Sequence, residues 1–182
     1  REELYPLKSS SFEDWLSAIN YKDSREVATS KLKSDTIDFL EGQTKFSGKK
    51  REVGFRVMGN EEYIEIDLGD KDWQSIYITR YNWRGRKHKN YFYRNKSMKS
   101  LPFPSKDKLD KDWAGNIFNI SGDSQSMLIM GWLIGCFMPD GPKPMLVIQG
   151  EQGSGKSFLA SMLRSLVDPA KADKTSLPSS ER

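Results

Sequence analysis

Residues 150–157 read Gly-Glu-Gln-Gly-Ser-Gly-Lys-Ser and have the spacing of a phosphate-binding loop, G-x-x-x-x-G-K-[ST]. Glycines in such a loop let the backbone wrap around an anion, so that successive N–H groups point at the phosphate oxygens. In this motif Lys156 reaches the β- and γ-phosphates, and the hydroxyl of Ser157 binds Mg²⁺. The spacing therefore predicts a site for ATP and Mg²⁺, with Lys156 as the catalytic candidate and Ser157 as the metal ligand. The residues predicted to bind the nucleotide are Gly150, Glu151, Gln152, Gly153, Ser154, Gly155, Lys156, Ser157 and Phe158.

The residues around this loop predict the elements that must position it. Pro144 ends the preceding segment, and residues 145–148 are apolar and typical of a strand. After the loop, apolar residues recur at steps of three and four, as on one face of a helix: Phe158, Leu159, Met162, Leu163, Leu166 and Val167. Strand, loop and helix is the order that the motif needs. An unrelated glycine-rich turn is the alternative, and this context disfavours it.

A second candidate site lies in a basic and aromatic stretch. Residues 80–111 contain eleven Lys and Arg but only two Asp, an excess of nine positive charges in a chain whose net charge is +4. Basic groups neutralise phosphates and aromatic rings stack on bases, so the mixture suits single-stranded DNA. The alternative is a solvated hairpin tip whose alternating aromatic residues bury one strand face. The candidates are Arg84, Arg86, Lys87, Lys89, Tyr91 and Tyr93.

Three further residues could do chemistry but are better explained by structure. Asp67 and Asp70 could be paired carboxylates or metal ligands, yet no histidine or third acid has matching spacing, so we predict that they cap turns. Cys136 is the only cysteine and lies in an apolar segment. We predict that it packs as a small hydrophobic residue, since an internal disulfide is impossible.

The periodicity of the chain predicts helices first and strands afterwards. An apolar stripe at residues 12–19 predicts a helix with Ser11 as its N-cap, and a second helix is expected over residues 24–41. Alternating residues then predict short antiparallel strands with one apolar face buried, separated by turns at 59–60 and 69–70. The predicted strands cover residues 53–57, 64–68, 76–78 and 91–94.

The C-terminal half is predicted to begin with a linker at residues 105–120. A helix capped by Ser121 or Asp123 should follow, and it is apolar on nearly all sides, which predicts burial. The expected fold is thus an α+β N-terminal module of helices and a short antiparallel sheet (1–104), a linker (105–120), and the start of an α/β P-loop NTPase core (121–182).

Composition restricts the partners and the location of the protein less strongly than the motifs do. The net charge of +4 permits a polyanionic partner without requiring one. The chain opens on a polar segment, and its longest apolar stretch, residues 127–138, is too short to cross a bilayer. We therefore expect a cytoplasmic protein with no membrane partner.

The segment from residue 64 to 182 resembles ATPases of phages and mobile elements, which are similar to the ATPase part of primase–helicases of the poxvirus and virulence-associated types. The resemblance rests on Tyr-Ile-Glu-Ile-Asp-Leu-Gly-Asp at 63–70 with Trp73, Gly-Trp-Leu-Ile at 131–134, the loop at 150–157, Leu-Val-Asp-Pro at 166–169 and Ser-Leu-Pro-Ser-Ser-Glu-Arg at 176–182. Residues 1–50 add nothing to it.

The resemblance implies an ATPase that acts in DNA replication, a helicase-type hydrolase assembled as a homo-oligomeric ring that moves single-stranded DNA. In such a protein the Walker B acids, a polar sensor residue and an arginine finger would lie beyond Arg182, so the chain is expected to be part of a longer protein. Hydrolysis by this chain is left open for that reason. Two alternatives remain: a nucleic-acid-binding module with a regulatory nucleotide site, and a P-loop kinase that acts on a small molecule.

Overall fold

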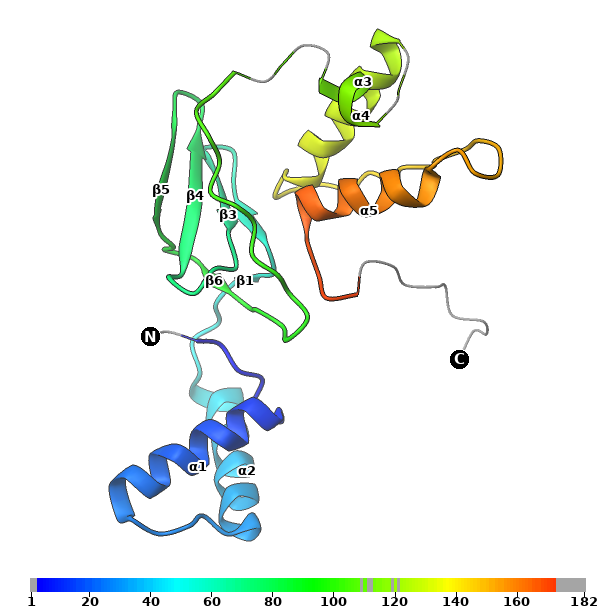
Figure 1. The fold of residues 1–182 in the computed structure, drawn as a ribbon. Helices are drawn as coiled ribbons and strands as arrows, with labels where there is room; N and C mark the ends of the chain where they lie inside the picture. Colours follow the sequence, from blue (N-terminus) through cyan, green and yellow to red (C-terminus); the bar gives the residue numbers. More distant parts are fainter. Residues whose placement is uncertain (1–2, 109, 111–112, 119, 121, 173–182) are drawn as a thin grey trace. The chain divides into compact units, whose positions relative to one another are not determined.

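The computed structural model describes residues 3–108, 110, 113–118, 120 and 122–172. Ser121, one of the two predicted helix caps, and the block at 176–182 lie outside the described residues. The chain divides into two compact units, Arg1–Val53 and Gly54–Arg182 (Figure 1). This division falls between the helical residues and the strands, whereas the sequence predicted a linker at 105–120.

The first unit is a pair of helices, α1 (Ser10–Ser24) and α2 (Ser30–Ser47). The N-cap of α1 is Ser9 rather than the predicted Ser11, because the Ser9 hydroxyl accepts a hydrogen bond from the Phe12 amide at 3.2 Å. The second helix begins later than residue 24, because Arg25 adopts a left-handed conformation that ends α1 and Thr29 caps α2.

Little apolar surface is buried between these two helices. Phe12 and Ile37 are the buried hydrophobic residues among the described ones of this unit. Lys8 pairs with Glu41 at 2.8 Å, and hydrogen bonds from Lys8 and Lys45 lower the pKa of the Glu41 carboxyl. Many large apolar side chains stay exposed, including Trp15, Ile19, Val27, Phe39 and Phe46.

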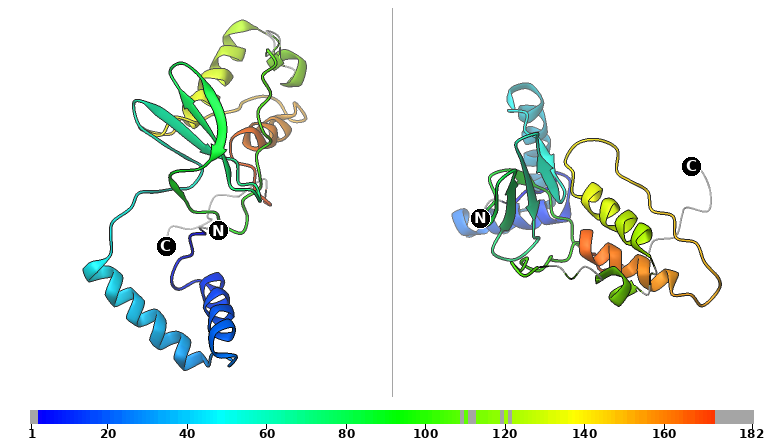
Figure 2. Two further views of the ribbon diagram at one scale, coloured as in Figure 1. Left: turned by 90° about the vertical axis from the view of Figure 1, so that its left-hand side faces the viewer. Right: turned by 90° about the horizontal axis from the view of Figure 1, so that it is seen from above.

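The second unit contains an antiparallel sheet of order β2-β3-β4-β5, with β2 at Val57–Gly59, β3 at Tyr63–Asp67, β4 at Gln74–Thr79 and β5 at Trp83–Lys87 (Figures 1 and 2). Strand β1 (Val53–Gly54) pairs with β6 (Tyr91–Phe92) in a second small sheet. The predicted turn at 69–70 lies in the connection between β3 and β4, whereas residues 60–62 connect β2 to β3 and the predicted turn residue Gly59 is the end of β2. Strand β5 was not predicted, because its sequence Trp-Arg-Gly-Arg-Lys has no apolar alternation and its pairing with β4 makes it a strand.

Both faces of this sheet carry buried residues, although the apolar pattern predicts burial of one face. On the apolar face Ile76 is buried, whereas Ile64 and Ile78, which pair in register, are half-buried. On the other face Glu65, Asp67 and Ser75 are completely buried. The prediction that the apolar face alone is buried is therefore wrong. Ion pairs with Arg86 and Arg94 explain how the carboxylates can be buried.

Three helices complete this unit: α3 (Trp113–Phe118), α4 (Asp123–Cys136) and α5 (Lys156–Val167). Helix α3 occupies part of the predicted linker. Phe118, Ile129 and Leu163 form the buried core between the helices.

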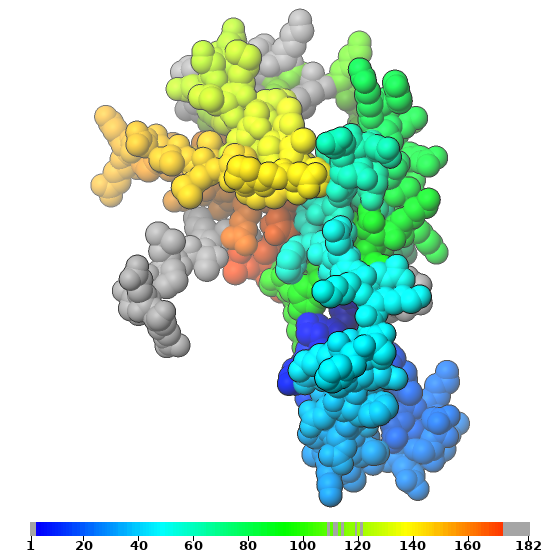
Figure 3. All heavy atoms as spheres, turned by 180° about the vertical axis from the view of Figure 1, so that it is seen from behind, coloured from blue at the N-terminus to red at the C-terminus, as the bar shows by residue number. Residues whose placement is uncertain are grey.

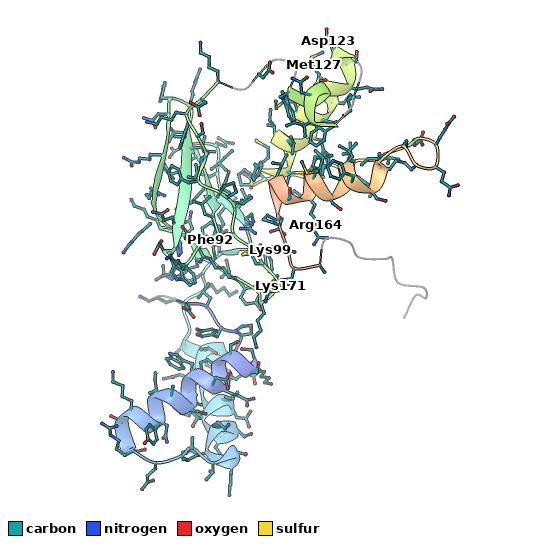
Figure 4. The ribbon with its side chains drawn as sticks, in the orientation of Figure 1. Phe92, Lys99, Asp123, Met127, Arg164 and Lys171 are labelled. Carbon is teal, nitrogen blue, oxygen red and sulfur yellow. The ribbon has the colours of Figure 1, made fainter. Side chains whose placement is uncertain are left out.

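Helix α4 is less buried than its composition predicts. Ile129 is its buried residue, while Met127, Leu128 and Ile134 are 69, 70 and 57% exposed (Met127 is labelled in Figure 4). The prediction of a fully buried helix is wrong for the described chain, because α3 and α5 cover one side of α4.

Residues 145–148 do not form a strand with a partner in the described chain, contrary to prediction. Leu146 and Ile148 are half-buried, whereas Met145 and Val147 are 89 and 70% exposed. This alternation of period two is that of a strand. A ladder also needs a neighbouring strand for its hydrogen bonds, and the described sheet does not extend to this segment.

A polar contact joins the end of α5 to the sheet. The guanidinium of Arg56 is buried and donates from Nε and Nη2 to Asp168 Oδ1 at 2.9 and 2.8 Å, and from Nη1 to the Asp67 carbonyl at 3.1 Å. Backbone bonds from Lys99 to Pro169 and from Lys171 to Ser97 flank it, and Lys99 and Lys171 are labelled in Figure 4. We call residues 97–99 and 168–171, with Arg56, the clasp.

Candidate nucleotide and nucleic-acid sites

The loop at residues 150–157 leads directly into helix α5. Gly153 and Gly155 have φ of 83° and 81°, a left-handed conformation that glycine adopts without steric cost. Gly155 is the N-cap of α5, and no side chain caps the helix there. The amides of the first helical turn therefore remain available to an anion, beside the partial positive charge of the helix N-terminus.

The ammonium group of Lys156 lies over this loop. Its Nζ donates to the Gly150 carbonyl at 2.8 Å, to the Glu151 carbonyl, and weakly to the Ser154 hydroxyl at 3.4 Å. All three acceptors are neutral, so no carboxylate neutralises the Lys156 charge in the described chain. A phosphate oxygen would make a stronger, charge-assisted bond than these groups do.

The remaining loop residues are accessible. Glu151, Gln152 and Ser157 are exposed, and Phe158 is 62% exposed. The loop and the segment before it lie at the molecular surface (yellow to orange in Figure 3). The structure thus brings the predicted nucleotide-binding residues together as one continuous surface at the N-terminus of α5.

The metal candidate is the Ser157 hydroxyl in the first turn of α5. Within the described ranges, no three His, Cys, Asp or Glu residues lie close enough to hold a metal ion. Mg²⁺ commonly takes few protein ligands and completes its shell with water and phosphate oxygens. The chemistry of the site therefore fits Mg²⁺ held jointly with a polyphosphate rather than by the protein alone.

A cavity of about 690 Å³ opens beside the loop, a volume within the range of ligand pockets. One wall is polar and comes from the loop. The other wall is largely apolar and comes from α3, α4, their connection, residues 146–149 and the start of α5, with Gln125 as a polar group. The apolar lining includes Ile117, Phe118, Ile120, Leu128, Ile129, Leu146, Phe158 and Leu159.

Cys136, at the end of α4, does not belong to this site. Burial raises the pKa of its thiol, with a smaller opposing effect from Lys143. The thiol is half-buried, which agrees only in part with the prediction of a buried small hydrophobic residue.

The second candidate site is not a single patch. Arg84 and Arg86 lie opposite Tyr77 and Ser75 on the polar face of the sheet, whereas Lys87 lies opposite Gln74 on the other face. Because successive residues of a strand point to opposite sides, the basic run of β5 is divided between two faces.

Arg86 is engaged inside the protein. Its Nη2 is 3.3 Å from Glu65 Oε2, and its guanidinium lies 3.5 Å from the centre of the Tyr77 ring. Glu65 is fully buried, and it also accepts bonds from Ser75 Oγ and Asn90 Nδ2, both at 2.7 Å. Arg86 therefore balances a buried carboxylate.

The other three candidates lie outside the sheet hairpin. The Lys89 amide donates to Glu65, and its side chain is exposed. Tyr91 is in β6, and Tyr93 donates its amide to Gly54 and contacts Phe55 edge-on. The structure does not gather the six predicted residues on one surface.

The two aspartates do cap turns, as predicted. Asp70 Oδ1 accepts the Gln74 amide at 2.8 Å, and Asp67 Oδ1 accepts the Gly69 amide at 3.1 Å. Asp67 has a second partner that the sequence did not indicate, because Arg94 donates to it from Nε at 2.8 Å and also from Nη2. The Arg94 guanidinium in turn lies 3.9 Å from the centre of the Trp73 ring.

Sequence reasoning missed two exposed residues at the β4–β5 turn, Arg80 and Tyr81. Both lie at the start of the basic stretch of residues 80–111. Their exposure depends on the turn between β4 and β5, which residue types and spacing do not indicate.

Comparisons with known proteins bear on the helical part of the second unit. No helix in the described ranges has the length and apolar character needed to cross a membrane. No curated protein and no solved structure matches the chain. Residues 112–182, which include α3–α5 and the loop at 150–157, are similar to a family described as actinomycete integrative conjugative element replication protein (AICE_RepA).

Proposed function

We propose that this protein binds ATP and Mg²⁺ at residues 150–157 and acts in the replication of a mobile genetic element. The observation that carries the nucleotide site is the position of Lys156, whose ammonium lies on neutral loop carbonyls at the uncapped N-terminus of α5. The replication role rests on the similarity of residues 112–182 to a replication protein family.

Each part of the loop has a separate task in this proposal. The amides of the first turn of α5, which follow Gly155, donate to phosphate oxygens, and Lys156 exchanges its carbonyl partners for the β- and γ-phosphates. Ser157 holds the metal ion, which when bound neutralises phosphate charge. The cavity beside the loop supplies an apolar wall for the base, with Gln125 able to contact its edge.

The reaction proposed for the whole protein is hydrolysis of ATP by in-line attack of water on the γ-phosphate, with release of ADP and phosphate. Lys156 and the loop amides would stabilise the charge that develops on the leaving oxygen. A helicase-type motor, a homo-oligomeric ring and movement along single-stranded DNA belong to the same proposal. The similarity to a replication family favours it over a small-molecule kinase.

Titration calorimetry with a non-hydrolysable ATP analogue and Mg²⁺ tests this proposal. We expect Lys156→Ala to reduce affinity about tenfold to a hundredfold or more, because a hydrogen bond to a charged group contributes roughly 1.5–3 kcal/mol. Lys106→Ala, which removes an exposed lysine outside the loop, is the matched control and should bind as the unaltered protein does.

Circular dichroism should show that both variants are folded. If Lys156→Ala is folded and keeps full affinity, the assignment of the loop is wrong.

A further inference from the structure

The turn between β4 and β5 is a rigid, exposed structure. The Thr79 amide donates to the Asn82 carbonyl at 2.8 Å, and the Thr79 hydroxyl bonds to the Asn82 carbonyl and side chain at 3.1 and 3.2 Å. The amides of Tyr81 and Asn82 donate to the same hydroxyl. These bonds fix the backbone from which Arg80 and Tyr81 project.

Tyr81 differs from the other tyrosines of this sheet. Tyr63 and Tyr77 stack on each other at 5.0 Å, and Arg86 lies over the Tyr77 ring. These contacts occupy the Tyr77 ring. Tyr81 is 89% exposed and takes part in none of the ring pairs found among the described residues. An exposed aromatic ring on a fixed turn is a stacking surface that needs no rearrangement of the protein.

Two arginines accompany this ring. Arg80 precedes it in the turn, and Arg84 follows on the polar face of β5, with its guanidinium 5.9 Å from the centre of the Tyr77 ring. Both side chains are exposed, and neither forms an ion pair with an acid within the described ranges. The two acids on this face of β3, Glu65 and Asp67, are already paired with Arg86 and Arg94. The two charges therefore remain available to phosphates.

We propose that Tyr81, Arg80 and Arg84 form a contact site for single-stranded DNA, separate from the nucleotide site. A tyrosine ring stacks on a base only when the base is unpaired, and the two guanidiniums bind the flanking phosphates. The choice of DNA over RNA rests on the proposed role in replication. The site replaces the predicted patch, since it adds Arg80 and Tyr81, keeps Arg84 and leaves out the other five predicted residues.

Fluorescence anisotropy of a labelled oligothymidylate tests this site with the full chain. Tyr81→Ala should weaken binding about 5- to 100-fold, the range for loss of one stacked base. Phe46→Ala is the matched control, because Phe46 is 95% exposed but lies in the first unit, and it should leave binding unchanged.

The arginines should act through charge. In the double variant Arg80→Gln/Arg84→Gln, the slope of log affinity against log salt should decrease in magnitude by about 1.4, or about 0.7 for each phosphate that an arginine no longer neutralises. The control Lys22→Gln/Lys31→Gln removes two exposed charges from the helices of the first unit and should not change the slope. Glu62→Gln, which removes an exposed acid from the adjacent β2–β3 turn, should tighten binding.

Several results would overturn the proposal: unchanged binding by Tyr81→Ala, equal or tighter binding of duplex DNA, or tighter binding of oligouridylate. The outcome is independent of the nucleotide site. If Lys156→Ala keeps its affinity for ATP while Tyr81→Ala binds DNA more weakly, the nucleotide proposal fails and the DNA contact site stands. If Lys156→Ala binds ATP more weakly while Tyr81→Ala keeps its affinity for DNA, the DNA contact site fails and the nucleotide proposal stands.

Discussion

Lys156 and Arg86 are both cations that the sequence offers to phosphate, and their immediate neighbours separate them. Lys156 contacts neutral oxygens of its own loop. Arg86 contacts the buried carboxylate of Glu65 and the face of Tyr77. Removing Arg86 from Glu65 would leave a buried charge without its ionic partner, a cost that a DNA phosphate would have to offset. Lys156 carries no such cost.

The other buried acid, Asp67, gives a stability prediction. Asp67 is completely buried, and Arg94 is its ionic partner. We expect Arg94→Met to lower the free energy of unfolding by about 3–5 kcal/mol, because it leaves the carboxylate buried and unpaired. Arg84→Met makes the same change at an exposed arginine and should cost no more than about 0.5 kcal/mol.

Urea unfolding followed by tryptophan fluorescence measures both values. Adding Asp67→Asn to Arg94→Met should recover part of the loss, since the buried group is then neutral. Equal stability of the two single variants would show that the buried ion pair does not support the sheet.

At the scale of elements, the clasp is the contact that links helix α5 to the sheet. Leu-Val-Asp-Pro at 166–169 and the block at 63–70 are separated by about a hundred residues, and Arg56 contacts both through Asp168 and the Asp67 carbonyl. The helix that begins at Lys156 thus ends against the sheet that carries Tyr81. In the sequence these two blocks share only their part in the resemblance to mobile-element ATPases. In the structure both contact Arg56.

Breaking the clasp should loosen its two backbone bonds. We expect Asp168→Ala to cost roughly 1–2 kcal/mol, less than a fully buried pair because the Asp168 side chain is 55% exposed. Hydrogen exchange at the amides of Lys99 and Lys171 should accelerate, since these amides donate across the clasp. The control Asp35→Ala, at an exposed site on α2, should leave both rates unchanged. Unaltered exchange in Asp168→Ala would mean that the ion pair does not hold the clasp.

The sequence predicted those elements whose pattern is local. The stripe of α1 and the alternation of β3 and β4 can be seen in the residue order. Strand β5 could not be predicted this way, because its identity depends on the ladder with β4. The start of α2 could not be predicted from periodicity, because it depends on the left-handed Arg25 that ends α1 and on the Thr29 cap.

The same reasoning separates the two candidate sites. The loop residues 150–157 are consecutive, so their types and spacing describe the site before any folding is known. The basic stretch depends on which residues face which side and which acids lie nearby. Neither Arg86's pairing with Glu65 nor the exposure of Tyr81 can be inferred from spacing.

At the scale of the whole molecule, the proposed nucleotide and DNA contacts both belong to the unit Gly54–Arg182. The two-helix unit Arg1–Val53 contributes to neither, and it supplies the matched controls for the DNA contact, Phe46→Ala and Lys22→Gln/Lys31→Gln. Within the larger unit the sites occupy different elements, the N-terminus of α5 and the β4–β5 turn. A ligand at one site should therefore leave direct contacts at the other unchanged.

The amide NMR spectrum with added Mg²⁺ and ADP tests the nucleotide site most directly, because it reports where the ligand binds. We predict that the largest shifts occur at the amides of residues 153–158, and that they disappear in Lys156→Ala. The amides of residues 80–84 should move little. Shifts elsewhere in the chain with an unchanged loop, or equal shifts in Lys156→Ala, would contradict the nucleotide site at residues 150–157.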